Sequence, residues 1–154
     1  MSANKLRNIL VDIVKKKVSP NTVNNSLNYL EDANLIFSVP ILSYKIKEQK
    51  LYPKKMYCID NGLINAVCIK FRERLGGLYE NLVAVELKRR GKEIYYWKNS
   101  KQEEVDFLVK NGLKVKEAIN VCYEISNEET KKRELRSIIA AANEFELKEA
   151  ILLT

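Results

Sequence analysis

Two alternating segments around a turn constrain the fold of this chain more than any other feature. Residues 104–126 read EVDFLVKNGLKVKEAINVCYEIS, a pattern of apolar and polar side chains that predicts two β-strands. Asp106 is a lone carboxylate among apolar neighbours. The alternation points it away from Val105, Phe107 and Val109, which we expect in the core. The acid at this position therefore calls for an explanation beyond the packing of the strand.

The residues on either side of this hairpin predict a mixed sheet with helices. Residues 78–90 have helical periodicity, and Gly91 is a natural C-terminal cap for that helix. Strand-like runs follow at 93–99 and 149–154, and Ser126 is expected to cap a helix before the last strand. Because a helix then crosses between two strands, we expect a mixed α/β sheet. The core-facing residues expected in the two helices are Leu82, Val83 and Leu87, then Leu135, Ile138, Ile139 and Ala142.

The first 62 residues predict a winged helix-turn-helix domain. Ser19-Pro20 begins a helix, because serine caps the end and proline in the first position loses no needed hydrogen bond. One face of that helix is apolar, and another carries four asparagines at i, i+3, i+4 and i+7 spacing, namely Asn21, Asn24, Asn25 and Asn28. Asparagine can pair with adenine in the major groove of DNA. A merely solvated face is the alternative interpretation of the same pattern.

Two β-type runs, at 35–47 and 54–60, predict the wing of that domain. The runs and the loop between them carry five lysines, Lys45, Lys47, Lys50, Lys54 and Lys55, with Tyr44 and Tyr52 interleaved. Lysines on such a hairpin suit DNA phosphates, and a net charge of +7 favours an anionic partner. Winged helices also serve as protein-interaction modules, so the pattern leaves both functions open.

The absence of histidine limits the chemistry available to the chain. It excludes Ser-His-Asp and Cys-His catalysis and histidine-ligated zinc. Any reaction would have to rely on carboxylates, lysines or a bound metal. No stretch approaches the roughly 20 apolar residues of a membrane span, and the N-terminus does not resemble a signal peptide. We therefore expect a cytoplasmic protein without a membrane partner.

Several segments resemble parts of one known protein group. GGLYENLVAVELKRRGKEIYYWKN, EVDFLV and AINVCYEIS resemble the C-terminal domain of archaeal and bacterial AAA-type ATPases, a domain similar to the PD-(D/E)xK nucleases. NTVNNSLNYLEDANLIFSV and KKMYCIDNGL resemble the winged helix that precedes it there. The resemblance implies an α+β chain: a winged helix-turn-helix over 1–62, then over 63–154 a restriction-endonuclease-like domain, truncated at its C-terminus, whose central mixed sheet is flanked by helices. The chain has no G-x-x-x-x-G-K-[ST] motif and so no phosphate-binding loop of its own.

The nuclease resemblance also implies where a catalytic site would lie. Glu80 matches the helix carboxylate of that fold, and Asp106 matches its strand aspartate. The next strand should read Ile-Glu-x-Lys, but the chain has Asn120 where the carboxylate belongs and Cys122 where the lysine belongs. Two anions hold Mg²⁺ weakly, and a cysteine supplies no positive charge. We therefore expect a relic of a metal site, with Glu80 and Asp106 as weak ligands at most and no cofactor.

Three functions remain open on the sequence alone. The leading one is a non-catalytic nucleic-acid-binding or interaction module, accessory to an AAA-type ATPase. The others are a Mg²⁺- or Mn²⁺-dependent DNA endonuclease, and a protein-interaction element that does not bind DNA. Lys88, Arg89 and Arg90 fit either a phosphate track beside the relic site or cations that complement a helix end. If Glu80 and Asp106 have only a structural role, we expect them to cap backbone amides or to pair with these three cations.

Overall fold

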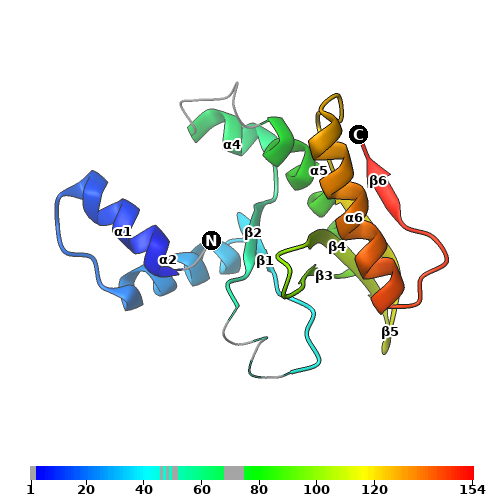
Figure 1. Cartoon of the computed structure of the whole chain (residues 1–154). Coiled ribbons are helices and arrows are strands. Elements are labelled where there is room, and N and C mark those ends of the chain that lie inside the picture. The colour runs from blue at the N-terminus through cyan, green and yellow to red at the C-terminus, as the bar shows by residue number, and fades with distance from the viewer. Residues whose placement is uncertain (1–2, 46, 48, 50–51, 68–74) are drawn as a thin grey trace.

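A computed structural model describes residues 3–45, 47, 49, 52–67 and 75–154 of the chain. The described part forms five α-helices and two sheets, which makes it a mixed α+β protein (Figure 1). None of the described helices has both the length and the apolar composition that a membrane crossing requires.

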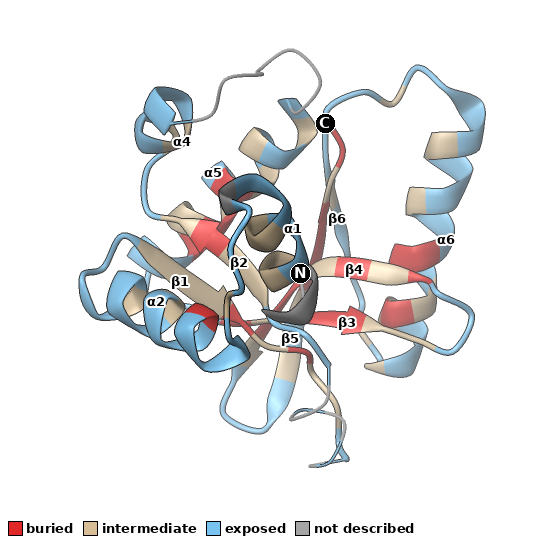
Figure 2. Cartoon of the chain, turned by 90° about the vertical axis from the view of Figure 1, so that its left-hand side faces the viewer, coloured by how far each residue is buried: buried red, intermediate tan, exposed pale blue. Residues whose placement is uncertain are grey.

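Two helices open the chain and pack on one another. They are α1 (Ala3–Val14) and α2 (Pro20–Asp32), and they lie to one side of the larger sheet (Figure 1). The predicted start of α2 is confirmed, because the Ser19 hydroxyl accepts a hydrogen bond from the Thr22 backbone N–H at 3.0 Å. Val23 is the one buried residue among the side chains described for this pair. Figure 2 shows the pair as mostly exposed or intermediate in burial.

A short antiparallel hairpin follows, formed by β1 (Ile36–Val39) and β2 (Lys55–Cys58). Both strands are shorter than the predicted ones. The first ends early because the chain leaves β1 at Pro40 and joins the larger sheet at Ile41. The Leu42 N–H donates to the Tyr96 carbonyl at 2.7 Å, and the Tyr96 N–H donates to the Pro40 carbonyl at 3.0 Å. The connection between the hairpin strands is thus attached to the second half of the molecule.

The larger sheet has the order β3-β4-β5-β6. Its strands are β3 (Glu93–Lys98), β4 (Glu104–Asn111), β5 (Lys114–Val121) and β6 (Ile151–Leu153). The first three pair in antiparallel fashion, and β6 lies parallel to β5. The chain reaches β6 through α6 (Glu128–Glu144), so the predicted mixed sheet with a crossing helix is confirmed. The winged-helix and nuclease-like assignments are more specific than this architecture, and they stay predictions.

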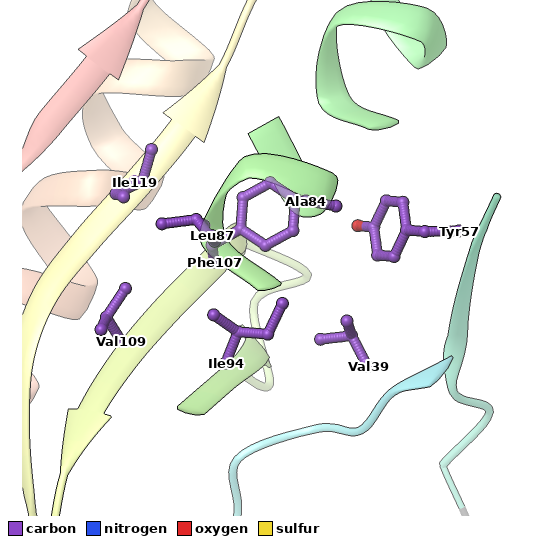
Figure 3. Packing of buried hydrophobic residues seen from close by; sticks show 8 residues of the cluster. All are labelled: Val39, Tyr57, Ala84, Leu87, Ile94, Phe107, Val109 and Ile119. Atoms are coloured by element: carbon purple, nitrogen blue, oxygen red, sulfur yellow. The ribbon is translucent and has the colours of Figure 1, made fainter. Parts of the chain in front are cut away.

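Both faces of the larger sheet are covered. On one face α5 (Leu75–Arg89) and the β1–β2 hairpin pack over Phe107 and Val109, as Figure 3 shows. On the other face α6 packs over Val105 and Leu108. Consecutive residues of β4 are therefore buried, and the strand is more apolar than a one-sided alternation would require. Preceding α5 is a short helix, α4 (Asn61–Val67).

The buried faces of α5 and α6 differ from the predicted stripes. In α5 the buried residues are Asn81, Ala84 and Leu87, whereas Leu82 is exposed. In α6 they are Ser137, Ile138 and Ala141, whereas Leu135 and Ile139 are exposed. The cap of α6 is Asn127, whose side-chain oxygen accepts from the Glu129 N–H at 2.8 Å, and not the predicted Ser126. Gly91 does follow α5 with φ +66, as its role as a C-terminal cap requires.

Candidate carboxylate site

One lysine lies among three carboxylates where the hairpin meets the larger sheet. Lys55, the first residue of β2, places Nζ 2.8 Å from Asp106 Oδ1, 2.9 Å from Glu104 Oε1 and 3.1 Å from Glu80 Oε1. Glu80 comes from α5, and the other two acids come from the start of β4. We call these four residues the carboxylate site. It joins residues that are up to 51 positions apart in the sequence.

The end of the β4–β5 ladder fixes Asp106. Regular pairing stops at Phe107 and Ile119, and beyond it side chains replace the backbone partners. Asp106 Oδ2 accepts from the Val121 N–H at 3.0 Å, and Asn120 Oδ1 accepts from the Asp106 N–H at 3.0 Å. The Asn120 amide also donates to Glu134 Oε2 at 3.0 Å. Asn120 is 1% exposed, and both the oxygen and the nitrogen of its amide are hydrogen-bonded, so the amide has a structural use that a second carboxylate would not fill.

Tyr57 connects the same strand to the helix carboxylate. Its hydroxyl donates to Glu80 Oε1 at 2.5 Å, and its ring lies 5.5 Å from the ring of Phe107. Burial, and then the negative charge of Glu80, raise the pKa of Tyr57 above its usual value. The phenol therefore stays protonated and acts as a donor to Glu80.

The electrostatics of the site favour a charged lysine. Burial alone would lower the pKa of Lys55, but the charges of Asp106, Glu80 and Glu104 raise it above its usual value. For Asp106 burial is the larger effect, and it raises the pKa despite the attraction of Lys55. Burial would also raise the pKa of Glu104, but Lys55 and then Lys98 lower it. The two acids shift in opposite directions because Asp106 is the more buried, at 18% against 36% exposed, and also lies near the charge of Glu80, whereas Glu104 has Lys98 as a second cation.

A hollow of about 450 Å³ lies beside the site. Glu80, Glu104 and Asp106 line it together with α6 residues that include Arg133 and Glu134. Within the described ranges, no group of three or more His, Cys, Asp or Glu residues is arranged to hold a metal ion. Glu80 and Asp106, the two carboxylates that the nuclease resemblance implies as metal ligands, contact the ammonium group of Lys55 in this arrangement. What the arrangement holds is the ammonium group of Lys55.

The structure brings together three of the four residues predicted for the relic site, and for the fourth, Cys122, it shows a different contact. Glu80 and Asp106 meet at Lys55, and Asn120 contacts the backbone of Asp106. Cys122 is buried, and its thiol donates to the Glu124 carbonyl at 3.3 Å, so the contact described for it is local. Of the structural roles expected for the two acids, capping of a backbone amide is confirmed for Asp106, which accepts from the Val121 N–H, and pairing with the arginines at the end of α5 was wrong. Arg89 and Arg90 bind Glu86 instead, at 2.7 and 2.6 Å, and their hydrogen bonds lower the pKa of Glu86 to about 2.

Lys55 also corrects the predicted set of DNA-binding lysines. Its side chain is 20% exposed and is engaged by three carboxylates, so it does not offer its charge to a phosphate. Alternation along β2 could not identify this position, because residues 56–59 are all apolar and do not show which face of the strand is buried. The structure shows it. Tyr57 is buried, and a residue two positions earlier in a strand lies on the same face.

The remaining predicted nucleic-acid-binding positions lie on the surface where the structure describes them. The exposed residues are Asn21, Asn24, Asn25, Asn28, Lys45, Lys47, Lys54, Lys88, Arg89 and Arg90. Lys50 lies outside the described residues. Lys88 additionally lies over the ring of Phe37, with Nζ 5.9 Å from its centre.

Comparisons with known proteins identify two domains in the chain. The model of a domain of unknown function, DUF4143, matches residues 75–154, and that of a second domain of unknown function, DUF8612, matches residues 2–74. An uncharacterized protein of Methanocaldococcus jannaschii is 37% identical over 150 residues, which are 96% of this chain and 32% of that relative. The chain thus spans about a third of the relative's length. No solved structure matches the chain.

Proposed function

The chain belongs to the DUF4143 family, and from that premise we propose that it is a non-catalytic nucleic-acid-binding module that accompanies an AAA-type ATPase. Domains of this family are typically associated with such ATPases. About two thirds of the length of the Methanocaldococcus relative lies outside the matched region, which leaves room there for further domains. Both observations support an accessory role.

The observation that carries the non-catalytic part of the proposal is the position of Lys55. Its Nζ lies within 3.1 Å of Glu80, Glu104 and Asp106, where a nuclease would present its acids to a metal. Because Lys55 is part of the chain, its ammonium group is present at the site at every metal concentration. A divalent cation would have to displace this group and break its three ion pairs. Asn120 and Cys122 supply neither a further carboxylate nor a free cation. The site therefore serves to attach the hairpin to the sheet.

The exposed polar surface supports nucleic-acid binding. The asparagines of α2 are exposed, and so are Lys45, Lys47 and Lys54. Lys55, the next residue in the sequence, instead forms ion pairs within the protein. Exposed lysines bind phosphates by displacing condensed counterions, which gives a salt-dependent affinity. Such contacts orient a protein on nucleic acid without reading its sequence.

A salt titration tests this function. We expect duplex DNA to bind with an affinity that falls as salt increases. The triple variant Lys45→Ala, Lys47→Ala, Lys54→Ala should weaken binding and flatten the plot of log affinity against log salt by about 0.9 for each lost contact. A matched control removes the same charge from another exposed surface, at Lys114, Lys116 and Lys148. Equal effects of the two triple variants would remove the hairpin from the interface, and no salt-dependent binding by the parent chain would favour a pure protein-interaction element.

Metal-dependent DNA cleavage is the second candidate function, because the carboxylates of Glu80 and Asp106 lie close together, both in contact with Lys55 Nζ. We expect no cleavage of plasmid or branched DNA above background in Mg²⁺ or Mn²⁺. Cleavage by the parent chain that is lost in Asp106→Asn would establish the nuclease and overturn the non-catalytic proposal. Asp106→Asn keeps the shape of the side chain, so it serves this test better than truncation to alanine.

A further inference from the structure

Two adjoining hollows lie where the β1–β2 connection meets β3. One, of about 400 Å³, is lined by Tyr44, Lys45 and Trp97 among others, and the second, of about 350 Å³, reaches Lys55 and Glu104 of the carboxylate site. Tyr52 and Lys98 line both hollows. The two hollows therefore form a track with a shared tyrosine and lysine in the middle, which we call the tyrosine groove.

Hydrogen bonds hold the walls of the tyrosine groove in place. On one side, the Leu42 N–H donates to the Tyr96 carbonyl at 2.7 Å. On the other, the Tyr96 hydroxyl donates to the Pro53 carbonyl at 2.7 Å. The segments that carry Tyr44 and Tyr52 are thus both fastened to the same residue of β3. A groove whose walls are fixed in advance costs little ordering when it binds.

Tyr44 and Tyr52 are the aromatic rings of this groove that a ligand can reach. Tyr44 is 82% exposed, and its ring lies 6.5 Å from that of Phe145. Tyr52 is 44% exposed. Trp97 is different, because it is 3% exposed and its indole N–H donates to Glu144 at 3.1 Å. The tryptophan is therefore part of the wall, and the two tyrosines are surfaces available for stacking.

The charges of the groove suit a chain of phosphates rather than a neutral ligand. Lys45 follows Tyr44 and lines the first hollow, and Lys98 lines both hollows. Lys54, two positions after Tyr52, is exposed but lines neither hollow. Two acids also line the groove, but each is engaged: Glu144 accepts from Trp97, and Glu104 binds Lys55 at 2.9 Å and Lys98 at 3.5 Å. Exposed aromatic rings interleaved with lysines are the features by which proteins bind single strands, whose bases stack while the backbone follows the positive charge.

We propose that the tyrosine groove binds single-stranded nucleic acid, with unpaired bases stacked on Tyr44 and Tyr52 and an adjoining phosphate on Lys45. This inference rests on the proposed nucleic-acid function and names its substrate class. A duplex cannot use the tyrosines in this way, because its bases are already stacked on one another. The groove therefore distinguishes unpaired from paired strands at a place where the lysines alone do not.

The test measures fluorescence anisotropy of a labelled oligothymidylate and of the same strand paired with oligoadenylate, at constant salt. Tyr44→Ala and Tyr52→Ala should each weaken single-strand binding by about 5- to 150-fold, the range observed for removal of one stacking ring. Tyr44→Phe and Tyr52→Phe, which keep the rings, should bind like the parent chain. Duplex affinity should stay unchanged in all four variants. Tyr79→Ala is the matched control, since Tyr79 is 45% exposed and lies outside the groove.

The outcomes separate this inference from the proposed function. If salt-dependent duplex binding persists but both alanine variants bind the single strand like the parent chain, the groove is wrong and the function stands. An equal loss of single-strand and duplex affinity would also overturn the groove, since it would show a general contact and not stacking. If neither strand form binds the parent chain, both proposals fail together. Circular dichroism of each variant ensures that a loss of affinity is not a loss of fold.

Discussion

The hairpin and the helix pair of the N-terminal half differ in what holds them. The β1–β2 hairpin buries Val39 and Tyr57 in the core beneath α5, and Lys55 adds three ion pairs to the second half (Figure 3). The α1–α2 pair contributes one buried side chain, Val23, among those described. Neighbours in the sequence thus belong to very different packing environments.

The packing of the hairpin shows that the two matched domains do not each have a hydrophobic core of their own. One family match ends at residue 74 and the next begins at residue 75, yet the core that contains Phe107 includes side chains from both sides of that boundary. The hairpin should fold and unfold with the larger sheet. The helix pair, with few buried contacts, should open at a lower free energy. The polar face of α2, which holds the four asparagines, would then belong to the part of the molecule that opens more easily.

The strongest test of this comparison is Phe107→Ala, which removes a ring that is 0% exposed. We expect a loss of about 3–5 kcal/mol in the free energy of unfolding, measured by urea denaturation. Because the Tyr57 ring packs 5.5 Å away, hydrogen exchange of the β2 amides should speed up together with that of β4. If the exchange of β2 stays slow while β4 opens, the hairpin does not depend on the sheet and the comparison is wrong.

The next largest effect is expected for Lys55→Met, which leaves three carboxylates close together without their cation. We expect a loss of about 2–3 kcal/mol at neutral pH, below the 3–5 kcal/mol of a fully buried pair because these side chains keep part of their exposure. Lys54→Met, at the exposed neighbouring position, should change stability by no more than about 0.5 kcal/mol. Similar losses in the two variants would show that the ion pairs of Lys55 do not hold the hairpin.

The pH dependence of the same variant sharpens the test. In the parent chain the pKa of Lys55 is raised, so its contribution is fully present below the unfolded pKa of about 10.4 and is lost only as pH rises through the folded pKa. The pKa of Asp106 is already raised by burial, and removing Lys55 raises it further. An acid with a raised pKa destabilises the fold as it ionises with rising pH. The deficit of Lys55→Met should therefore shrink as pH falls from neutral toward the unfolded carboxylate pKa of about 4, and a constant deficit would contradict this account.

Local signals in the sequence predicted two of the three helix ends for which a capping residue was named, and the third, Ser126, was wrong by one residue. Ser19-Pro20 and Gly91 were confirmed because capping needs only neighbouring backbone groups. The apolar stripe predicted for α5 was right at Leu87 and Val83 but wrong at Leu82, because the buried face of the helix contains a polar residue. Asn81 is only 4% exposed. Its buried amide is satisfied because it accepts from the Cys58 N–H at 2.8 Å and donates to the Cys58 carbonyl at 2.9 Å. Hydrophobic periodicity cannot predict that a polar side chain is buried because its amide bonds the backbone of a strand, as a neighbouring strand would.

The carboxylate site was predicted in part for a similar reason. The resemblance to a nuclease pointed to Glu80 and Asp106, and the structure does bring them together. Lys55 was assigned to DNA because a lysine in a basic run is usually solvated, and its actual partners lie 25 to 51 positions away. Only the packing of the hairpin on β4 places them in contact. Whether the exposed lysines and asparagines bind nucleic acid stays a prediction.

The smallest expected effect belongs to the helix pair. Val23→Ala removes two methyl groups from a side chain that is 2% exposed, which costs about 1–2 kcal/mol locally. Because α1 and α2 bury little else, we expect faster hydrogen exchange in these two helices and a shift of only a few tenths of a kcal/mol in the unfolding transition of the larger sheet. Fluorescence of Trp97 reports that transition, since it is the one tryptophan of the chain and lies buried in β3. The matched control is Val39→Ala, the same deletion at a fully buried position of the hairpin, which should move the Trp97 transition by its full cost. If both valine variants shift the Trp97 transition equally, the helix pair is as firmly coupled to the core as the hairpin, and the distinction between the two regions fails.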